Sequence, residues 1–212
     1  MSNALQGRAP FTAILRGLAP EEALAVGDAL VSAGMTILEV PLNSPRPLES
    51  IHLMAQRFGD SCLIGAGTVM TAQQVEEIAE AGGRLIVMPH GDAAVIAAAK
   101  RLGMVCMPGI ATPTEGFAAL RAGADALKLF PAELVGPPVL RALRAVFPKD
   151  TIFLPVGGIT PDNLAEFVQA GASGFGLGSG LYKPGRDAAD VGVRAVAYLE
   201  AWDRAATPSN AG

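Results

Sequence analysis

Short apolar runs alternate with longer stretches rich in Ala, Leu and Glu along the whole chain. The runs are continuously apolar, which is typical of strands buried on both faces of a parallel sheet. We count eight of these runs and predict a strand at each. They cover Thr12–Leu15, Thr36–Val40, Cys62–Gly65, Arg84–Met88, Met104–Met107, Ala126–Phe130, Ile152–Pro155 and Gly174–Leu177.

The stretches between these runs carry signals for the starts and ends of helices. Pro and acidic residues open the first and seventh of them, at Pro20-Glu21-Glu22 and Pro161-Asp162, as in a first helical turn. Ala-Gly pairs end several others. The predicted helices cover Pro20–Ala33, Pro47–Phe58, Ala72–Ala81, Ala93–Leu102, Thr114–Ala122, Pro138–Val146, Pro161–Ala170 and Asp187–Ala206.

Eight strand–helix units predict an α/β protein folded as a compact (β/α)8 TIM barrel. An open doubly wound sheet fits the same alternation and is the alternative. No Rossmann glycine fingerprint follows the first predicted strand, which favours the barrel. We expect residues 1–212 to form one domain, with residues 1–9 and 207–212 as flexible tails.

Composition narrows the class of protein. Of the 212 residues, 50% are hydrophobic and 17% charged, which excludes intrinsic disorder for most of the chain. The net charge of -4 argues against nucleic-acid binding. The sequence shows no membrane span and no signal peptide, so we expect a cytoplasmic protein without a membrane partner.

Cys62 and Cys106 lie in apolar runs and are expected to be buried and free. His52 and His90 are far apart and predict no metal site.

Lys128 and Glu39 are charged residues inside apolar runs, close to the ends of predicted strands. In a barrel, chemistry is located at these ends. Burial lowers the pKa of a lysine, and a neutral amine can attack a carbonyl to form a Schiff base. Burial raises the pKa of a carboxyl group, which suits a proton shuttle. The structural alternatives are a lysine that reaches the rim of the barrel and an ion pair of Glu39 with Lys128 or Arg16.

Other polar or flexible residues follow the remaining predicted strands. The guanidinium of Arg16 has the geometry to bind a carboxylate or phosphate group. The alternative is an arginine that is solvated at the surface and binds no ligand. Thr68 offers a hydroxyl to a substrate oxygen, or caps the helix that starts near Ala72. Glycine clusters end the last two strands, where barrels often bind phosphate through backbone amides; tight turns are the alternative. These clusters contain Gly157, Gly158, Gly176, Gly178 and Gly180.

Six short motifs along the chain resemble those of the KDPG/KHG aldolase family. The resemblance extends from about Phe11 to Lys183 and depends on the order and spacing of the motifs. They are Ala13-Ile14-Leu15-Arg16-Gly17, Glu39-Val40-Pro41-Leu42-Asn43-Ser44-Pro45, Gly65-Ala66-Gly67-Thr68-Val69, Pro108-Gly109 with Thr112, Lys128-Leu129-Phe130-Pro131 and Val156-Gly157-Gly158-Ile159.

The resemblance implies a class I aldolase that needs no metal or other cofactor and forms a homotrimer. Lys128 would form the Schiff base and Glu39 would be the general acid and base. Arg16 and Thr68 would bind the pyruvate portion of the substrate, with Pro89 lining it. The phosphate would be held by Gly157, Gly158, Gly178 and Ser179.

Within the family, the motifs are closest to the branch that cleaves 2-dehydro-3-deoxy-6-phosphogalactonate to pyruvate and D-glyceraldehyde 3-phosphate. Glucose-configured relatives usually have Thr-Leu-Arg-Thr after the glutamate, where this chain has Pro41-Leu42-Asn43-Ser44. Asn43 and the nearby Arg46 are the polar groups available in place of the missing arginine. Those relatives also tend to have Thr where Val156 stands, so a different C4 epimer preference is expected.

Several alternatives remain at this stage. The substrate could have the other C4 configuration or be 4-hydroxy-2-oxoglutarate. Another phosphate-binding barrel enzyme, such as an isomerase or a metal-dependent pyruvate aldolase, is a second class. A non-catalytic sugar-phosphate-binding barrel is a third. The presence of both Lys128 and Glu39 argues against the last.

Overall fold

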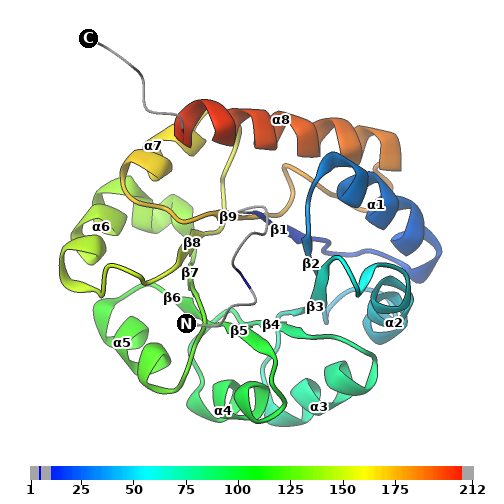
Figure 1. Cartoon of the computed structure of the whole chain (residues 1–212), viewed down its shortest axis with the longest axis horizontal. Coiled ribbons are helices and arrows are strands. Elements are labelled where there is room, and N and C mark those ends of the chain that lie inside the picture. The colour runs from blue at the N-terminus through cyan, green and yellow to red at the C-terminus, as the bar shows by residue number, and fades with distance from the viewer. Residues whose placement is uncertain (1–4, 6–10, 207–212) are drawn as a thin grey trace.

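A computed structural model describes residue 5 and residues 11–206, and places the strands at the centre with the helices around them (Figure 1). The predicted tails 1–9 and 207–212 lie outside the described residues, apart from Leu5. The described strands are β1 (Phe11–Ile14), β2 (Ile37–Pro41), β3 (Leu63–Gly67), β4 (Leu85–Val87), β5 (Val105–Met107), β6 (Gly109–Ile110), β7 (Leu127–Leu129), β8 (Phe153–Pro155) and β9 (Phe175–Leu177). The described helices are α1 (Pro20–Ala33), α2 (Pro47–Phe58), α3 (Ala72–Glu80), α4 (Ala93–Arg101), α5 (Pro113–Arg121), α6 (Ala132–Val146), α7 (Leu164–Gln169) and α8 (Ala188–Ala206).

The helices occur where the sequence predicts them, and their starts and ends agree within one residue except at the starts of α6 and α7. The predicted bounds of α1 and α2 match those observed. The α6 helix begins at Ala132, six residues before the predicted start, and is kinked at Gly136, which has φ 62°. The α7 helix is shorter than predicted and begins at Leu164. The α1 helix ends as expected, because Gly34 adopts the left-handed conformation that closes the last turn.

The strands pair in parallel in two sheets. One sheet has the order β5-β4-β3-β2-β1-β9 and the other the order β6-β7-β8. The fifth predicted strand, Met104–Met107, is observed as β5. A short strand that was not predicted, β6, follows after Pro108, which has no amide hydrogen for a sheet. The two sheets approach each other through a parallel bridge between Val156 and Gly176. This pairing confirms a parallel α/β fold with eight described helices, but does not establish a closed eight-stranded barrel.

Side chains on the strands divide between two buried clusters, because successive residues of a strand point to opposite faces. In β2, Leu38 belongs to the larger cluster, which also contains helix residues. Ile37 belongs to the smaller cluster, whose buried members come almost entirely from strands. Glu39 lies two residues after Ile37, and Lys128 two residues after Ala126 of the smaller cluster. Both charged residues therefore share the strand face that points away from the helices.

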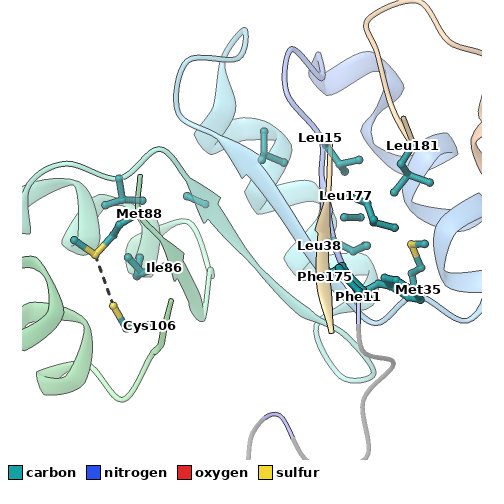
Figure 2. Close-up of a cluster of buried hydrophobic side chains, with 14 of the residues drawn as sticks. Phe11, Leu15, Met35, Leu38, Ile86, Met88, Cys106, Phe175, Leu177 and Leu181 are labelled. Atoms are coloured by element: carbon teal, nitrogen blue, oxygen red, sulfur yellow. Dashed lines mark hydrogen bonds between the residues drawn. The ribbon is translucent and has the colours of Figure 1, made fainter. Parts of the chain in front are cut away.

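The larger cluster joins strands to the helices that cover them. Figure 2 shows Leu38 of β2, Leu177 of β9 and Leu15, which follows β1, on the same side of these strands. In the same cluster, the Sγ of Cys106 lies 3.8 Å from the Sδ of Met88 (Figure 2). Cys62 and Cys106 are both buried and free, as predicted. Among the described residues, no helix has the length and apolar character needed to cross a bilayer.

Candidate active site

A cavity of about 860 Å³ lies beyond the carboxyl ends of the strands. Its walls include segments that follow β1, β3, β4, β7, β8 and β9, so residues far apart in the sequence converge here. Glu39 does not line it, but is buried close enough for its charge to interact with Lys128 and Arg16. The other predicted site residues all line it: Arg16, Thr68, Pro89, Lys128, Gly157, Gly158, Gly178 and Ser179.

Lys128 is held inside the molecule by β7 and is 7% exposed. Burial lowers the pKa of its ammonium group; the charge of Arg16 lowers it further, and Glu39 opposes both. The Nζ atom lies 4.8 Å from the centre of the Phe130 ring. Lys128 forms no ion pair within 4.0 Å among the described residues, whereas Lys100 pairs with Asp125 at 2.5 Å. The two structural alternatives, a lysine at the rim and a close ion pair, therefore do not describe Lys128.

Glu39 is 1% exposed, and its Oε2 atom has no hydrogen-bond partner among the described residues. Space for the carboxyl group comes from β3, because a Cβ atom at Gly67 would overlap it. Burial raises the pKa of Glu39 from its ordinary value of 4.5 to about 7, although the charges of Lys128 and Arg16 favour the ionised form. Near neutral pH this carboxyl group can therefore both donate and accept a proton.

The raised pKa of Glu39 predicts a pH-dependent cost to stability. Below about pH 4.5 the group is protonated in the folded and the unfolded chain. Between 4.5 and about 7 only the unfolded chain releases the proton, so the free energy of unfolding falls as pH rises. Above this range the cost is about 3 kcal/mol. Glu39→Gln should remove it.

Thermal or urea unfolding of the two proteins over a pH series measures this difference. The variant should be more stable than the wild type at about pH 8, and the two should converge towards pH 4.5. Titrating groups that do not interact with Glu39 cancel in this comparison, because both proteins contain them. A difference that does not vary with pH would show that the carboxyl group of Glu39 titrates normally.

The loop after β2 holds the end of β1. The guanidinium Nη1 of Arg16 donates a hydrogen bond of 2.7 Å to Oδ1 of Asn43, and both residues line the cavity. The amide of Gly17 donates to Oγ of Ser44 at 2.9 Å. Arg46 lies outside the cavity, because its guanidinium pairs with Glu21 and Glu49. Of the two polar groups proposed to replace the missing arginine, only Asn43 reaches the cavity.

Thr68 is placed in the cavity by an uncommon backbone conformation. Its φ of 57° is in the left-handed region, which a β-branched residue rarely adopts. The alternative role as a helix cap is wrong, because Thr71 is the N-cap of α3 and forms a capping box with Gln74. The hydroxyl of Thr68 is therefore not used by α3, and a strained residue at such a position often has a functional role.

The two predicted phosphate-binding glycine clusters differ in their surroundings. A Cβ atom at Gly157 or at Gly158 would overlap the side chain of Glu133, which lies over these two residues. A Cβ atom at Gly178 would meet nothing within 4 Å, so this backbone faces open space. Lys183 follows on the same segment and also lines the cavity. The backbone at Gly178, which is open and close to Lys183, therefore suits an anion better than the backbone at Gly157 and Gly158, which the carboxylate of Glu133 covers.

Sequence reasoning missed Glu133 and Lys183 as lining residues. Each is close in sequence to a predicted motif: Glu133 is five residues after Lys128, and Lys183 is four after Ser179. This proximity was the only signal that could have indicated them.

The two histidines lie in different parts of the fold: His52 lies on α2 and His90 follows β4. In the described part of the chain, no three His, Cys, Asp or Glu residues are grouped so that they could hold a metal ion.

Comparison with known proteins identifies the family of this chain. The family model for "KDPG and KHG aldolase" matches residues 3–191. A protein of Rhizobium meliloti (strain 1021) with the name "Probable 2-dehydro-3-deoxy-6-phosphogalactonate aldolase" is 52% identical over 194 residues, which are 92% of each chain.

Two solved structures show the same fold. One, described as "Native KDPGal structure", superposes with a TM-score of 0.93 at 46% identity and covers 95% of this chain and 98% of its own. The other is KDPG aldolase from Legionella pneumophila with pyruvate captured as a covalent carbinolamine intermediate. It has a TM-score of 0.82 at 28% identity and covers 90% of this chain and 94% of its own. The chain therefore belongs to the KDPG and KHG aldolase family.

Proposed function

We propose that the protein is a class I aldolase of sugar-acid catabolism. It cleaves 2-dehydro-3-deoxy-6-phosphogalactonate to pyruvate and D-glyceraldehyde 3-phosphate through a Schiff base on Lys128. The observation that carries this proposal is a buried lysine with a lowered pKa in the cavity wall, within electrostatic reach of a buried glutamate whose pKa is near neutrality. The relative in Rhizobium meliloti supports the substrate, and the carbinolamine in the Legionella relative supports the chemistry.

The reaction begins when the neutral amine of Lys128 attacks the C2 ketone of the substrate. The carbinolamine loses its hydroxyl group as water, with a proton from Glu39, and leaves a cationic iminium. The Glu39 carboxylate then takes the proton of the C4 hydroxyl through a water molecule. The C3–C4 bond breaks, its electron pair moves into the iminium to give an enamine, and glyceraldehyde 3-phosphate leaves.

The second half of the reaction returns both groups to their starting states. Glu39 protonates the enamine at C3, which gives the iminium of pyruvate. Water adds to this iminium while Glu39 takes up a proton, and breakdown of the carbinolamine frees pyruvate and Lys128. A carboxyl group with a pKa of about 7 suits this repeated exchange, because neither protonation state is strongly favoured.

The charged ends of the substrate are assigned to separate parts of the cavity. Arg16 and Thr68 bind the carboxylate, beside Pro89. Gly178, Ser179 and Lys183 bind the phosphate, and Gly157 and Gly158 line the adjacent wall. The net charge of -4 does not attract an anionic substrate, so attraction depends on these local groups.

Val156 is proposed to influence the choice of C4 epimer. Its side chain lines the cavity and packs closely over the Cα of Gly176, and it has no hydroxyl to contact the substrate. We expect Val156→Thr to raise kcat/KM for the glucose-configured epimer relative to the galactose-configured one by about fivefold, since one hydrogen bond contributes on the order of 1 kcal/mol. Kinetics with both epimers measure this ratio. An unchanged ratio would remove Val156 from this role.

The quaternary and overall architecture is part of the proposal. Two contacts between the two sheets support a single domain with a closed (β/α)8 barrel. One is the bridge between Val156 and Gly176. The other is the hydrogen bond of 3.0 Å that the amide of Asp125, just before β7, donates to the carbonyl of Cys106 in β5. A homotrimer is inferred from the family resemblance, and the location in the cytoplasm stays a prediction from the sequence. Exposed apolar side chains such as Leu134 and Val193 are compatible with contacts between subunits.

Release of pyruvate from three substrates tests the proposed function. We expect the fastest release from 2-dehydro-3-deoxy-6-phosphogalactonate, with slower release from the glucose-configured epimer and from 4-hydroxy-2-oxoglutarate. Activity should survive EDTA, which a metal-dependent aldolase would not. Tight binding without turnover would instead support a non-catalytic sugar-phosphate-binding protein.

A further inference from the structure

The guanidinium of Arg16 is held by a neutral side chain. Its described hydrogen bond is the one of 2.7 Å to Oδ1 of Asn43, and it pairs with no carboxylate within 4.0 Å among the described residues. Six other described arginines do pair with a carboxylate. These are Arg46, Arg57, Arg101, Arg186, Arg194 and Arg204. The positive charge of Arg16 thus remains available to an anion in the cavity.

The residue after Asn43 fixes the backbone that carries Arg16. Oγ of Ser44, which is buried, accepts the amide hydrogen of Gly17 at 2.9 Å. The amide of Leu15 donates to the carbonyl of Glu39 at 2.9 Å. The end of β1 is therefore attached to β2 and its loop on both sides of Arg16, and Asn43 sets the direction of the side chain itself.

The held guanidinium lies near the reacting groups. Its charge acts on both Lys128 and Glu39, so it lies within electrostatic reach of the amine that would attack the C2 ketone. In a 2-keto acid the carboxylate is bonded directly to that carbon. A carboxylate in place of the Asn43 amide would form the same hydrogen bond but neutralise the guanidinium, whereas the amide orients it and leaves the charge intact.

We propose that Asn43 is a positioning residue, which holds the Arg16 guanidinium in the cavity as the binding group for the carboxylate of the 2-keto acid. This rests on the proposed function. Glucose-configured relatives usually have an arginine in the loop after β2, where this chain has Asn43. Here that loop contributes to anion binding indirectly, because Asn43 orients Arg16, which follows the neighbouring strand β1.

Two variants of the full chain separate orientation from charge. Asn43→Leu removes the acceptor without adding a charge, and should raise the half-saturating pyruvate concentration about tenfold. Asn43→Asp keeps the shape of the side chain and the hydrogen-bond acceptor, but its charge neutralises the Arg16 guanidinium and repels the pyruvate carboxylate. The half-saturating pyruvate concentration should therefore rise at least as much as in Asn43→Leu. Asn43 is exposed, so neither change should prevent folding. Gln56→Glu, at an exposed position of α2, is the control for added charge and should have no effect.

The measurement is the rate of covalent trapping by sodium borohydride as a function of pyruvate concentration. The account predicts a raised half-saturating concentration in both Asn43 variants, with the maximal rate at saturating pyruvate within about twofold of wild type. A purely structural role would lower the maximal rate and the melting temperature instead. An unchanged half-saturating concentration in either variant would overturn the role of Asn43. Failure of the wild-type protein to trap pyruvate would overturn the proposed function, and this inference with it.

Discussion

Replacing Lys128 with Met is expected to abolish aldol cleavage, with a loss in kcat of about 10⁴-fold or more. Methionine is apolar and of similar length, so it fits the buried position on β7 but has no amine to attack the C2 ketone. Without the Schiff base, the electron pair of the C3–C4 bond has no acceptor. Steady-state release of pyruvate from the purified variant measures the loss.

The matched control for this variant is Lys149→Met. Lys149 is exposed and does not line the cavity. The control should keep the activity of the wild type, so a loss confined to Lys128→Met is specific to that position. A Lys128→Met protein that is folded and retains more than a small fraction of the activity would rule out the Schiff-base assignment.

Replacing Glu39 with Gln is expected to slow turnover by about 10²–10⁴-fold, the range typical of a lost acid–base group. The amide has the shape of the carboxyl group but cannot transfer the proton. Cleavage and the exchange of pyruvate methyl protons with solvent should both slow, because Glu39 takes the C4 hydroxyl proton during cleavage and transfers the C3 proton during exchange. Proton exchange is followed by NMR in deuterated water.

The control is Glu133→Gln, at the other glutamate placed beside the cavity. Glu133 is exposed and lies over Gly157 and Gly158 rather than in the buried interior. We expect it to retain most of the methyl-proton exchange. Exchange at the wild-type rate in Glu39→Gln would remove Glu39 from its role, even if cleavage were slowed.

The strand positions could be predicted from local pattern, and so could the residues that share a strand face with Glu39 and Lys128; the structure shows that this face points away from the helices. Continuous apolar runs indicate buried strands, and the period of two places Glu39 with Ile37 and Lys128 with Ala126. The start of α1 was predicted correctly from Pro20 and the acidic residues of its first turn, whereas the same signal at Pro161-Asp162 placed the start of α7 three residues too early. These features depend on residues within one turn or one strand.

Other features depend on contacts between distant segments, which local pattern does not contain. The break at Pro108 places Gly109 against the backbone of Pro89, and the early start of α6 follows a segment packed beside β8. Asn43 and Arg46 looked equivalent in the sequence, yet only Asn43 meets Arg16, because Glu21 on α1 attracts Arg46. Glu133 and Lys183 reach the cavity only because the loops converge there.

The most direct test of the Schiff base is mass spectrometry after reduction with sodium borohydride in the presence of pyruvate, followed by peptide mapping. The account predicts one reduced pyruvate per chain, attached to Lys128. Lys183 lines the same cavity and provides an internal comparison, because the account predicts no adduct there. A folded protein that gives no adduct in excess pyruvate, or gives one only on Lys183, would contradict the assignment of Lys128 as the nucleophile.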